Sequence, residues 1–294
     1  MMYRFVCAVL AACALVGQLY GQEAQEKQAN LVVGAGIGLA REQLHWSIAG
    51  DAQGQNPPVL SELAWEGLYG AKTWMDVECH IGDGWVCAAN FSHMAIFNGQ
   101  ARDTDYGGDN RTATLFDMRF SSNRGHTLSY GGLVGYRLHW HRFSWVPYVG
   151  YRRHTQHLLL LDGGALESTY HTKWEGPEIR LSASYRYPTI LYGCTISYAQ
   201  LRYGAIADWN LVDTFAHPVS FTHKAKGFAV RFTGSLLLFP HAKVSPLAFV
   251  QYGMMRTGTG IDELYLADGG RRFTQLNGVR GNSMALGVGL TCRW

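Results

Sequence analysis

Apolar side chains recur at every second position through most of this chain, and this alternation constrains the fold more than any other feature. From Met284 to Trp294 every second residue is apolar or cysteine, and the residues between them are small, polar or basic. The same period runs through residues 128–138, 179–187, 190–199 and 228–238. A period of two indicates a β-strand with one apolar face. The sequence therefore predicts an all-β chain of long antiparallel strands.

The opposite face of each predicted strand is small, polar or arginine, which is the inverse of the packed interior of a soluble sandwich. Apolar outward and polar inward is typical of a transmembrane barrel. Lipid offers no hydrogen bonds to the backbone, so such a sheet has to close. A soluble sandwich or lectin-like barrel is the alternative. It is less favoured, because the segments 227–239 and 281–294 exceed typical sandwich strands and would carry arginine into a core.

The connections between predicted strands alternate in length. Short turns are expected at residues 80–84, 139–142, 187–189 and 240–243, and longer polar stretches at 48–60, 99–125, 156–170, 203–220 and 259–275. Five long loops and four short turns predict a ten-stranded antiparallel transmembrane β-barrel. In outer-membrane barrels the short turns face the periplasm and the long loops face outward. Both chain ends are then expected in the periplasm, and the loops at the cell surface.

The start of the chain predicts export. Arg4, the apolar stretch from Phe5 to Gly17 and a small-residue cleavage site before Gln22 indicate a signal peptide over residues 1–21. The mature barrel would then cover residues 22–294. A lipoprotein-processing box ending at Cys13 is a less favoured reading of this segment. The apolar stretch is shorter than a membrane-spanning helix needs, so the sequence predicts no helical anchor.

Composition limits the partners and cofactors of the chain. The formal net charge is only +3, and no block of Lys and Arg with interleaved aromatics is present, which argues against nucleic-acid binding. Cys79 and Cys87 flank a predicted turn and could form a disulfide; the favoured reading is that these two, Cys194 and Cys292 are free thiols on strands. Without a CxxC pair we expect no metal site. His154 and His157 do not share a face of a strand, so we expect residues 152–157 to be a mobile basic loop.

Two acidic segments could carry chemistry. Asp103 and Asp105 lie one residue apart where a strand meets a loop, so both side chains point to one face. Carboxyl groups held this close raise each other's proton affinity and can activate water. Asp208 is followed two residues later by Asn210, which cannot exchange protons near neutral pH. Turn chemistry alone also explains an Asp-rich and Gly-rich segment.

At this point the chain resembles the omptins, which are ten-stranded outer-membrane endopeptidases of Gram-negative bacteria. The resemblance spans most of the mature chain. It rests on the order and spacing of Ser61-Glu62-Leu63-Ala64-Trp65, Asp103-Thr104-Asp105-Tyr106, Gly150-Tyr151, Asp162-Gly163-Gly164, residues 170–177, Ser184-Tyr185-Arg186-Tyr187 and Pro240-His241-Ala242-Lys243-Val244.

The resemblance implies a catalytic site in which an Asp pair faces an Asp-His pair across the barrel mouth, with a water molecule between them. Asp103 and Asp105 match the first pair, and Asp208 matches the Asp that orients the histidine. Asn210 stands at the position of the family histidine. Loss of a general base lowers rates by about 10² to 10⁴. His217 is a candidate substitute base, and His223 a second one.

The resemblance also implies sites for substrate and lipid. Glu42, Gln43 and Ile206 match the region where omptins select a basic side chain, although Gln43 and Ile206 replace the family's acidic groups. Lys173 and Lys226 match basic residues that hold a lipopolysaccharide phosphate, and Thr155 replaces an Arg. Lipopolysaccharide is therefore an expected activating lipid, and no other cofactor is expected. Ordinary charge at the membrane rim explains these lysines equally well.

Two functions follow as hypotheses. The first is an omptin-like aspartyl-type endopeptidase with weak or lost activity. The second is a non-catalytic, surface-exposed and monomeric barrel that binds host or matrix proteins through its loops. A passive pore is the least favoured function, because Arg180, Arg186 and Arg231 are expected to fill the lumen.

Overall fold

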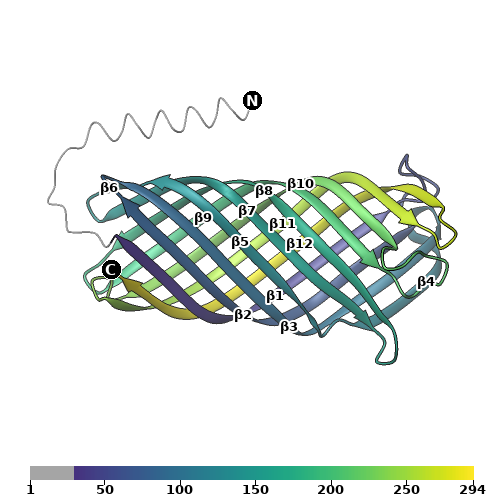
Figure 1. The fold of residues 1–294 in the computed structure, drawn as a ribbon, viewed down its shortest axis with the longest axis horizontal. Coiled ribbons are helices and arrows are strands. Elements are labelled where there is room, and N and C mark those ends of the chain that lie inside the picture. Colours follow the sequence, from purple (N-terminus) through teal and green to yellow (C-terminus); the bar gives the residue numbers. More distant parts are fainter. Residues whose placement is uncertain (1–29) are drawn as a thin grey trace.

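The computed structural model describes residues 30–294, which form one antiparallel sheet (Figure 1). The expected signal peptide, residues 1–21, lies outside these residues. The strands are β1 (Leu31–Ile48), β2 (Ser61–Ile81), β3 (Trp85–Gly108), β4 (Thr112–Ser121), β5 (Gly125–Tyr136), β6 (Leu138–Trp140), β7 (Phe143–Leu161), β8 (Glu167–Arg186), β9 (Ile190–Asp208), β10 (Phe221–Leu238), β11 (Val244–Tyr265) and β12 (Arg271–Arg293). A short 3-10 turn, η1 (Asp109–Arg111), joins β3 to β4.

The sheet closes into a ring because β1 pairs with both β2 and β12. β4, β5 and β6 lie end to end as one member of that ring: β3 pairs with β4 along residues 100–108 and with β5 along residues 85–95, and β6 pairs with the start of β7. The twelve strand segments therefore make ten barrel members. The predicted ten-stranded antiparallel barrel is confirmed.

The two ends of the barrel differ. Residue 31 and the C-terminus lie together at one end, where Leu31 and Trp294 exchange backbone hydrogen bonds. We call this the terminal end, and it holds the four predicted short turns. The other end, which we call the loop end, carries the connections at residues 49–60, 109–111, 162–166, 209–220 and 266–270.

A band of exposed apolar side chains encircles the barrel nearer the terminal end. It includes Ile37, Met75, Phe91, Val134, Val149, Ile179, Ile196, Phe232, Val250 and Val288. Aromatic residues border this band on both sides: Trp85, Trp140, Phe143, Tyr187 and Trp294 toward the terminal end, and Tyr69, Tyr130, Tyr151, Tyr198 and Tyr252 toward the loop end. Apolar bands with aromatic girdles are the membrane-facing surface of outer-membrane barrels.

The strands continue well beyond this band, and four of the predicted long loops are therefore wrong. β3 alone has 24 residues and β8 has 20, whereas about 9–11 residues cross a membrane. Much of the sequence at 99–125, 156–170, 203–220 and 259–275 is strand. Residues 152–157, expected in a mobile loop, lie in the middle of β7. Beyond the band the outward face of the sheet carries polar and charged residues, so polar sequence there does not distinguish strands from loops.

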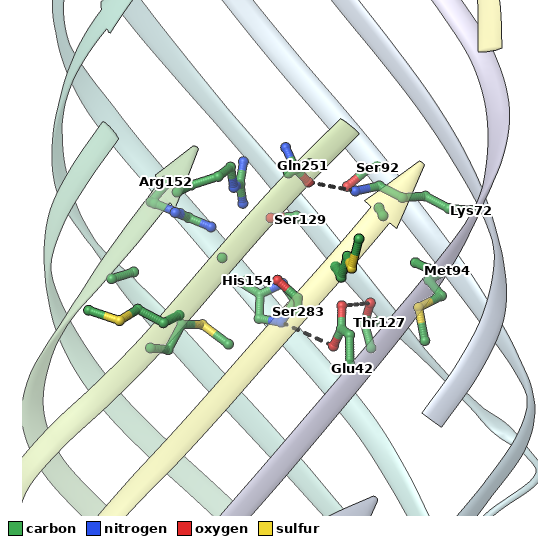
Figure 2. A pocket seen from close by; sticks show the side chains of 18 of the residues that line it. Glu42, Lys72, Ser92, Met94, Thr127, Ser129, Arg152, His154, Gln251 and Ser283 are labelled. Carbon is green, nitrogen blue, oxygen red and sulfur yellow. Dashed lines mark hydrogen bonds and ion pairs between the residues drawn. The ribbon is translucent and has the colours of Figure 1, made fainter. Parts of the chain in front are cut away.

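Two layers fill the lumen. Toward the loop end lies an aromatic core that includes Trp46, Trp65, Tyr170, Trp174, Tyr203, Trp209 and Phe221. Toward the terminal end the lumen holds charged side chains: Arg180 donates to Glu178 at 2.9 Å, and Arg231 is enclosed among charged groups. A smaller apolar cluster of Val86, Leu133, Val146 and Tyr148 also lies in this part of the barrel. Figure 2 shows the pocket between these layers, where Lys72 donates to Gln251.

All four cysteines of the described segment are free. Cys79 on β2 lies directly opposite Cys87 on β3. Within residues 30–294 no helix is long and apolar enough to cross a membrane.

Candidate functional site

Asp103 and Asp105 both lie on the inward face of β3 near the loop end. The register between β2 and β3 shifts between Glu66 and Gly70, where the strands leave the apolar band. Such an irregularity re-aims the following side chains. The buried residues Val86, Met94 and Ile96 of β3 are even-numbered, whereas Gly99, Ala101 and Asp103 are odd-numbered, so the shift turns Asp103 toward the interior. Thr104 and Tyr106, at the end of the strand, are buried as well.

The surroundings of Asp103 explain an unusual proton affinity. Asp103 is 5% exposed, and its partners across the sheet are Leu63 of β2 and Met118 of β4. Burial raises the pKa of Asp103 to about 8, and the Asp105 carboxyl adds to the rise. Burial also raises the pKa of Asp105, although a hydrogen bond from Ser61 opposes this. Asp103 is therefore protonated at neutral pH and lies beside a second carboxyl group.

Asp208, at the end of β9, has a histidine partner. The loop of residues 209–220 brings His217 over it, and Nδ1 of His217 lies 2.6 Å from Oδ1 of Asp208. Both side chains are partly open to solvent. The chain thus contains an Asp-His pair near the position that the sequence suggested, and it uses a loop histidine.

This Asp-His pair lies on the opposite face of the barrel wall from the Asp pair. The residues of β9 that face the interior are odd-numbered, and Tyr203, Ala207 and Trp209 are buried in the aromatic core. Asp208 alternates with them and shares the outward face with Ile206, which is 50% exposed. The structure therefore does not bring the two pairs together around one point in the mouth.

Asn210 lies in the loop after β9 and is hydrogen-bonded to the start of β8. Its side-chain amide donates to the backbone carbonyl of Glu167, and its backbone amide donates to the hydroxyl of Ser168. Both partners belong to β8. Asn210 therefore ties the loop after β9 to the neighbouring strand.

A second histidine, His223 on β10, faces the interior and is fully enclosed. Its Nδ1 lies 2.8 Å from the hydroxyl of Tyr170, and its Nε2 lies 3.1 Å from Oδ1 of Asp262. Tyr170 also contacts the hydroxyl of Tyr203, and Trp46 packs edge-on against the imidazole. Because of these contacts His223 is part of the aromatic core. The partner of Asp208 is His217, not His223.

The three residues expected to bind substrate are dispersed. Glu42 is buried in the lumen below the aromatic core, where it accepts a hydrogen bond from Thr127 at 3.2 Å (Figure 2). It accepts a second hydrogen bond from Gln156 at 2.9 Å. Gln43 alternates with Glu42 and lies on the outward face of β1. Ile206 is on the outward face of β9. None of the three shares a surface with Asp103.

A free sheet edge lies beside the Asp pair. β4 pairs with β3 along nearly its whole length, but its ladder with β7 consists of one pair, Ser121 with Leu161. The hairpin of β3 and β4 therefore rises past its neighbour at the loop end (Figure 1). Its side chains are mostly exposed, including Met118 and Leu115, which is 71% exposed. The sequence did not predict this edge, because residues 99–125 were expected to form a loop.

Basic residues cover the outer wall just beyond the apolar band. Arg153, Glu175, Arg202 and Lys226 lie in register on β7, β8, β9 and β10. One step closer to the loop end, Thr155, Lys173 and Lys224 face outward, and Lys173 contacts Glu175 at 2.9 Å. The structure thus places the predicted Lys173 and Lys226 on one surface. It adds Arg153, Arg202 and Lys224, which only the strand pairing could reveal.

Known proteins are similar to this chain in two ways: one family model matches its sequence, and solved outer-membrane barrels match its fold. Residues 34–292 match the model of a family described as Pom, Protochlamydia outer membrane protein. No curated protein is detectably similar in sequence. The crystal structure of the outer membrane protease OmpT from Escherichia coli matches with a TM-score of 0.74, over 93% of this chain and 99% of that chain, at 13% sequence identity. At this identity the match shows the fold alone.

Two further solved barrels overlap with most of the chain at TM-scores below 0.5. The translocator domain of the autotransporter NalP from Neisseria meningitidis has a TM-score of 0.37 at 12% identity and covers 98% of this chain and 97% of that chain. The outer membrane protein OprG from Pseudomonas aeruginosa has a TM-score of 0.35 at 9% identity and covers 91% and 97%, respectively.

Proposed function

Because the chain belongs to the Protochlamydia outer membrane protein family, we propose that it is an outer-membrane barrel whose loop end faces the cell exterior and binds extended segments of other proteins without hydrolysing them. The resemblance of its fold to an outer-membrane protease supports this placement of the loops. We expect a monomer, with its apolar band in lipid.

The free edge of β4 carries this proposal. An exposed edge offers a row of unpaired backbone donors and acceptors, and an extended peptide can add to it as a further strand. Because Ser122 donates its amide to Gly99 of β3, alternation turns the amides of Asp117 and Arg119 toward the free edge. Exposed Leu115 and Met118 flank these amides and offer apolar contacts to alternate side chains of a bound strand.

The arrangement of the acidic groups argues against hydrolysis as the main activity. A site of the omptin type would need a histidine on the interior side of the wall, facing the water molecule held by Asp103 and Asp105. His217 lies with Asp208 on the outward face, and the inward-facing His223 is enclosed by Tyr170 and Asp262. The Asp103–Asp105 pair and the Asp208–His217 pair therefore do not combine into one hydrolytic site.

A proline substitution tests the edge. Arg119→Pro removes a backbone donor that faces the free edge and leaves the ladder with β3 intact, since proline is tolerated on edge strands. Arg119→Ala removes the same side chain and keeps the donor. Peptides selected from a randomised display library on the refolded wild-type barrel should bind the alanine variant and lose at least about tenfold in affinity for the proline variant. Equal affinity for both variants would refute binding at this edge.

A weak endopeptidase is the second candidate, and the proton held by Asp103 favours it. A protonated carboxyl beside a second carboxyl is the arrangement with which aspartic proteases activate water. The test is cleavage of a randomised fluorogenic peptide library, with and without lipopolysaccharide. Cleavage that disappears in Asp103→Asn and persists in His217→Ala would establish a hydrolase that uses the Asp pair alone. Equal signals from wild type and Asp103→Asn would exclude this candidate.

The basic outer wall supports a lipid partner for the same barrel. Arg and Lys side chains that point outward just beyond an apolar band meet the phosphate groups of lipid. Arg153, Arg202 and Lys226 lie in that position in register. We therefore expect a phosphorylated outer-leaflet lipid such as lipopolysaccharide to bind there.

A further inference from the structure

Four histidines form a row across the outer wall, and neither function above uses them. His126, His157 and His171 lie directly opposite one another on β5, β7 and β8. His93 of β3 continues the row, with its ring centroid 5.7 Å from that of His126. The row lies on the loop-end side of the basic residues, and therefore beyond the apolar band. Sequence spacing could not show it, because the four residues come from four strands.

The two central rings approach most closely. Nδ1 of His157 lies 3.2 Å from Nδ1 and 3.0 Å from Nε2 of His171, and the ring centroids are 4.2 Å apart. The centroids of His126 and His157 are 5.3 Å apart. His126 and His171 are exposed and His157 is partly exposed, so an ion from solvent can reach them.

This separation of nitrogens matches one metal ion. Imidazole nitrogens bind Zn²⁺ at about 2.0–2.1 Å, so two nitrogens on one ion at angles of about 90–110° lie about 2.9–3.4 Å apart. The observed 3.0–3.2 Å falls within this interval. Direct cross-strand neighbours are held in place by the ladder, and only rotation of the rings is needed to aim both nitrogens at one point.

Competing partners for these rings are few. Lys173, the nearest cation on the same face of β8, is directed to Glu175 on the side away from His171. Glu167, the carboxylate nearest to His157 and His171, forms an ion pair with Arg124 at 3.1 Å. Imidazoles without a carboxylate partner keep a nitrogen lone pair for a ligand.

We propose that His157 and His171 bind one divalent transition-metal ion of the Zn²⁺ or Cu²⁺ class on the outer wall of the barrel, with His126 beside it. Imidazole ligands favour these ions over Ca²⁺ and Mg²⁺, which prefer oxygen. Among the described residues no three His, Cys, Asp or Glu side chains are preassembled around a metal position. The site is therefore open, with water filling the remaining positions. This set of residues differs from the His154 and His157 pair considered in the sequence, since His154 faces the lumen.

The experiment is a calorimetric titration of the refolded chain, without an affinity tag and in phosphate-free detergent, with Zn²⁺. We expect one saturable site, and Cu²⁺ at the same site should give an electron paramagnetic resonance spectrum with nitrogen hyperfine splitting from two imidazoles. His157→Ala and His171→Ala should each weaken binding by more than about tenfold. His93→Ala, at the end of the row, is the matched control and should bind as wild type does.

Both test positions are on the surface of the wall, so the variants should fold, and a heat-modifiability gel checks this. Saturable binding that survives in the His157→Ala, His171→Ala double variant would overturn the proposal. Heat of binding that never saturates in wild type would overturn it too. An excess of Ca²⁺ should not displace Zn²⁺, and displacement would contradict a site made of imidazoles.

Discussion

Asp103→Asn should stabilise the barrel, and its effect should depend on pH. Asparagine has nearly the shape of a protonated aspartic acid and cannot ionise. In the folded chain the pKa of Asp103 is raised from 3.8 to about 8, because the carboxyl is buried and Asp105 lies beside it. The unfolded chain releases this proton at much lower pH. Folding of the wild type therefore requires proton uptake across this interval.

The sign and size follow from linkage. Between about pH 4 and pH 8 the folded state holds one proton more than the unfolded state, so wild-type stability falls as pH rises, and above pH 8 it stays level. A full proton is worth about 1.4 kcal/mol per pH unit. Over the interval from pH 5 to pH 8 this gives at most about 4 kcal/mol, and water entry and local relaxation reduce such costs. We expect Asp103→Asn to gain about 1–3 kcal/mol between these pH values.

Denaturant unfolding followed by tryptophan fluorescence, at pH 5, 6.5 and 8, measures this gain. Asp109→Asn, at the exposed turn of the same hairpin, controls for the loss of one negative charge. The stability difference between Asp103→Asn and wild type should widen steadily with pH. A difference that is constant across the series, or a variant less stable than wild type at pH 8, would refute the burial of a protonated carboxyl.

Three further predictions concern the core, the loop and the outer wall. Trp65→Ala should cost about 3–5 kcal/mol, because its fully buried ring stacks on Tyr170 at 5.0 Å between centroids; an unfolding midpoint equal to that of wild type would contradict this. Asn210→His should gain no cleavage of a fluorogenic peptide library, since the side chain at 210 points to Glu167 of β8; cleavage by this variant alone would show that position 210 reaches the mouth. Arg202→Ala with Lys226→Ala should weaken lipopolysaccharide binding about tenfold in a vesicle assay, and Arg256→Ala, farther around the barrel, should not; equal losses in both would indicate nonspecific charge attraction.

The sequence predicted the architecture because the membrane imposes a strict alternation on every strand. Residues such as Leu286, Val288 and Leu290 face lipid and their neighbours face a narrow lumen, so the period of two is unbroken there. The four short turns were predicted for the same reason, since they lie at the edge of the apolar band. Beyond the other edge the alternation weakens, and there Arg102 and Asp117, an exposed ion pair on β3 and β4, were expected to lie in a loop.

The candidate site was less predictable because it depends on which face each strand turns inward. Asp103 and Asp105 were correctly expected to share a face. For Asp208 the relevant fact is that Trp209, its neighbour, is the residue buried in the aromatic core. A shift of one residue in the register of a strand moves each of its side chains to the other face. Resemblance to another family at low sequence identity does not determine that register. The rows of histidines and basic residues depend on pairing between strands, which no local pattern shows.

The free edge of β4 also limits what can occupy it. Two copies of the barrel stand the same way up in one membrane, and barrel strands are tilted by about 35–45°. A twofold rotation about the membrane normal reverses the tilt, so the β4 edges of two neighbouring barrels would cross at about 70–90° and share only a point of contact. Two copies in one membrane therefore cannot pair with each other along their β4 edges. An extended peptide that is not part of a barrel can adopt the direction of β4 and pair along its edge.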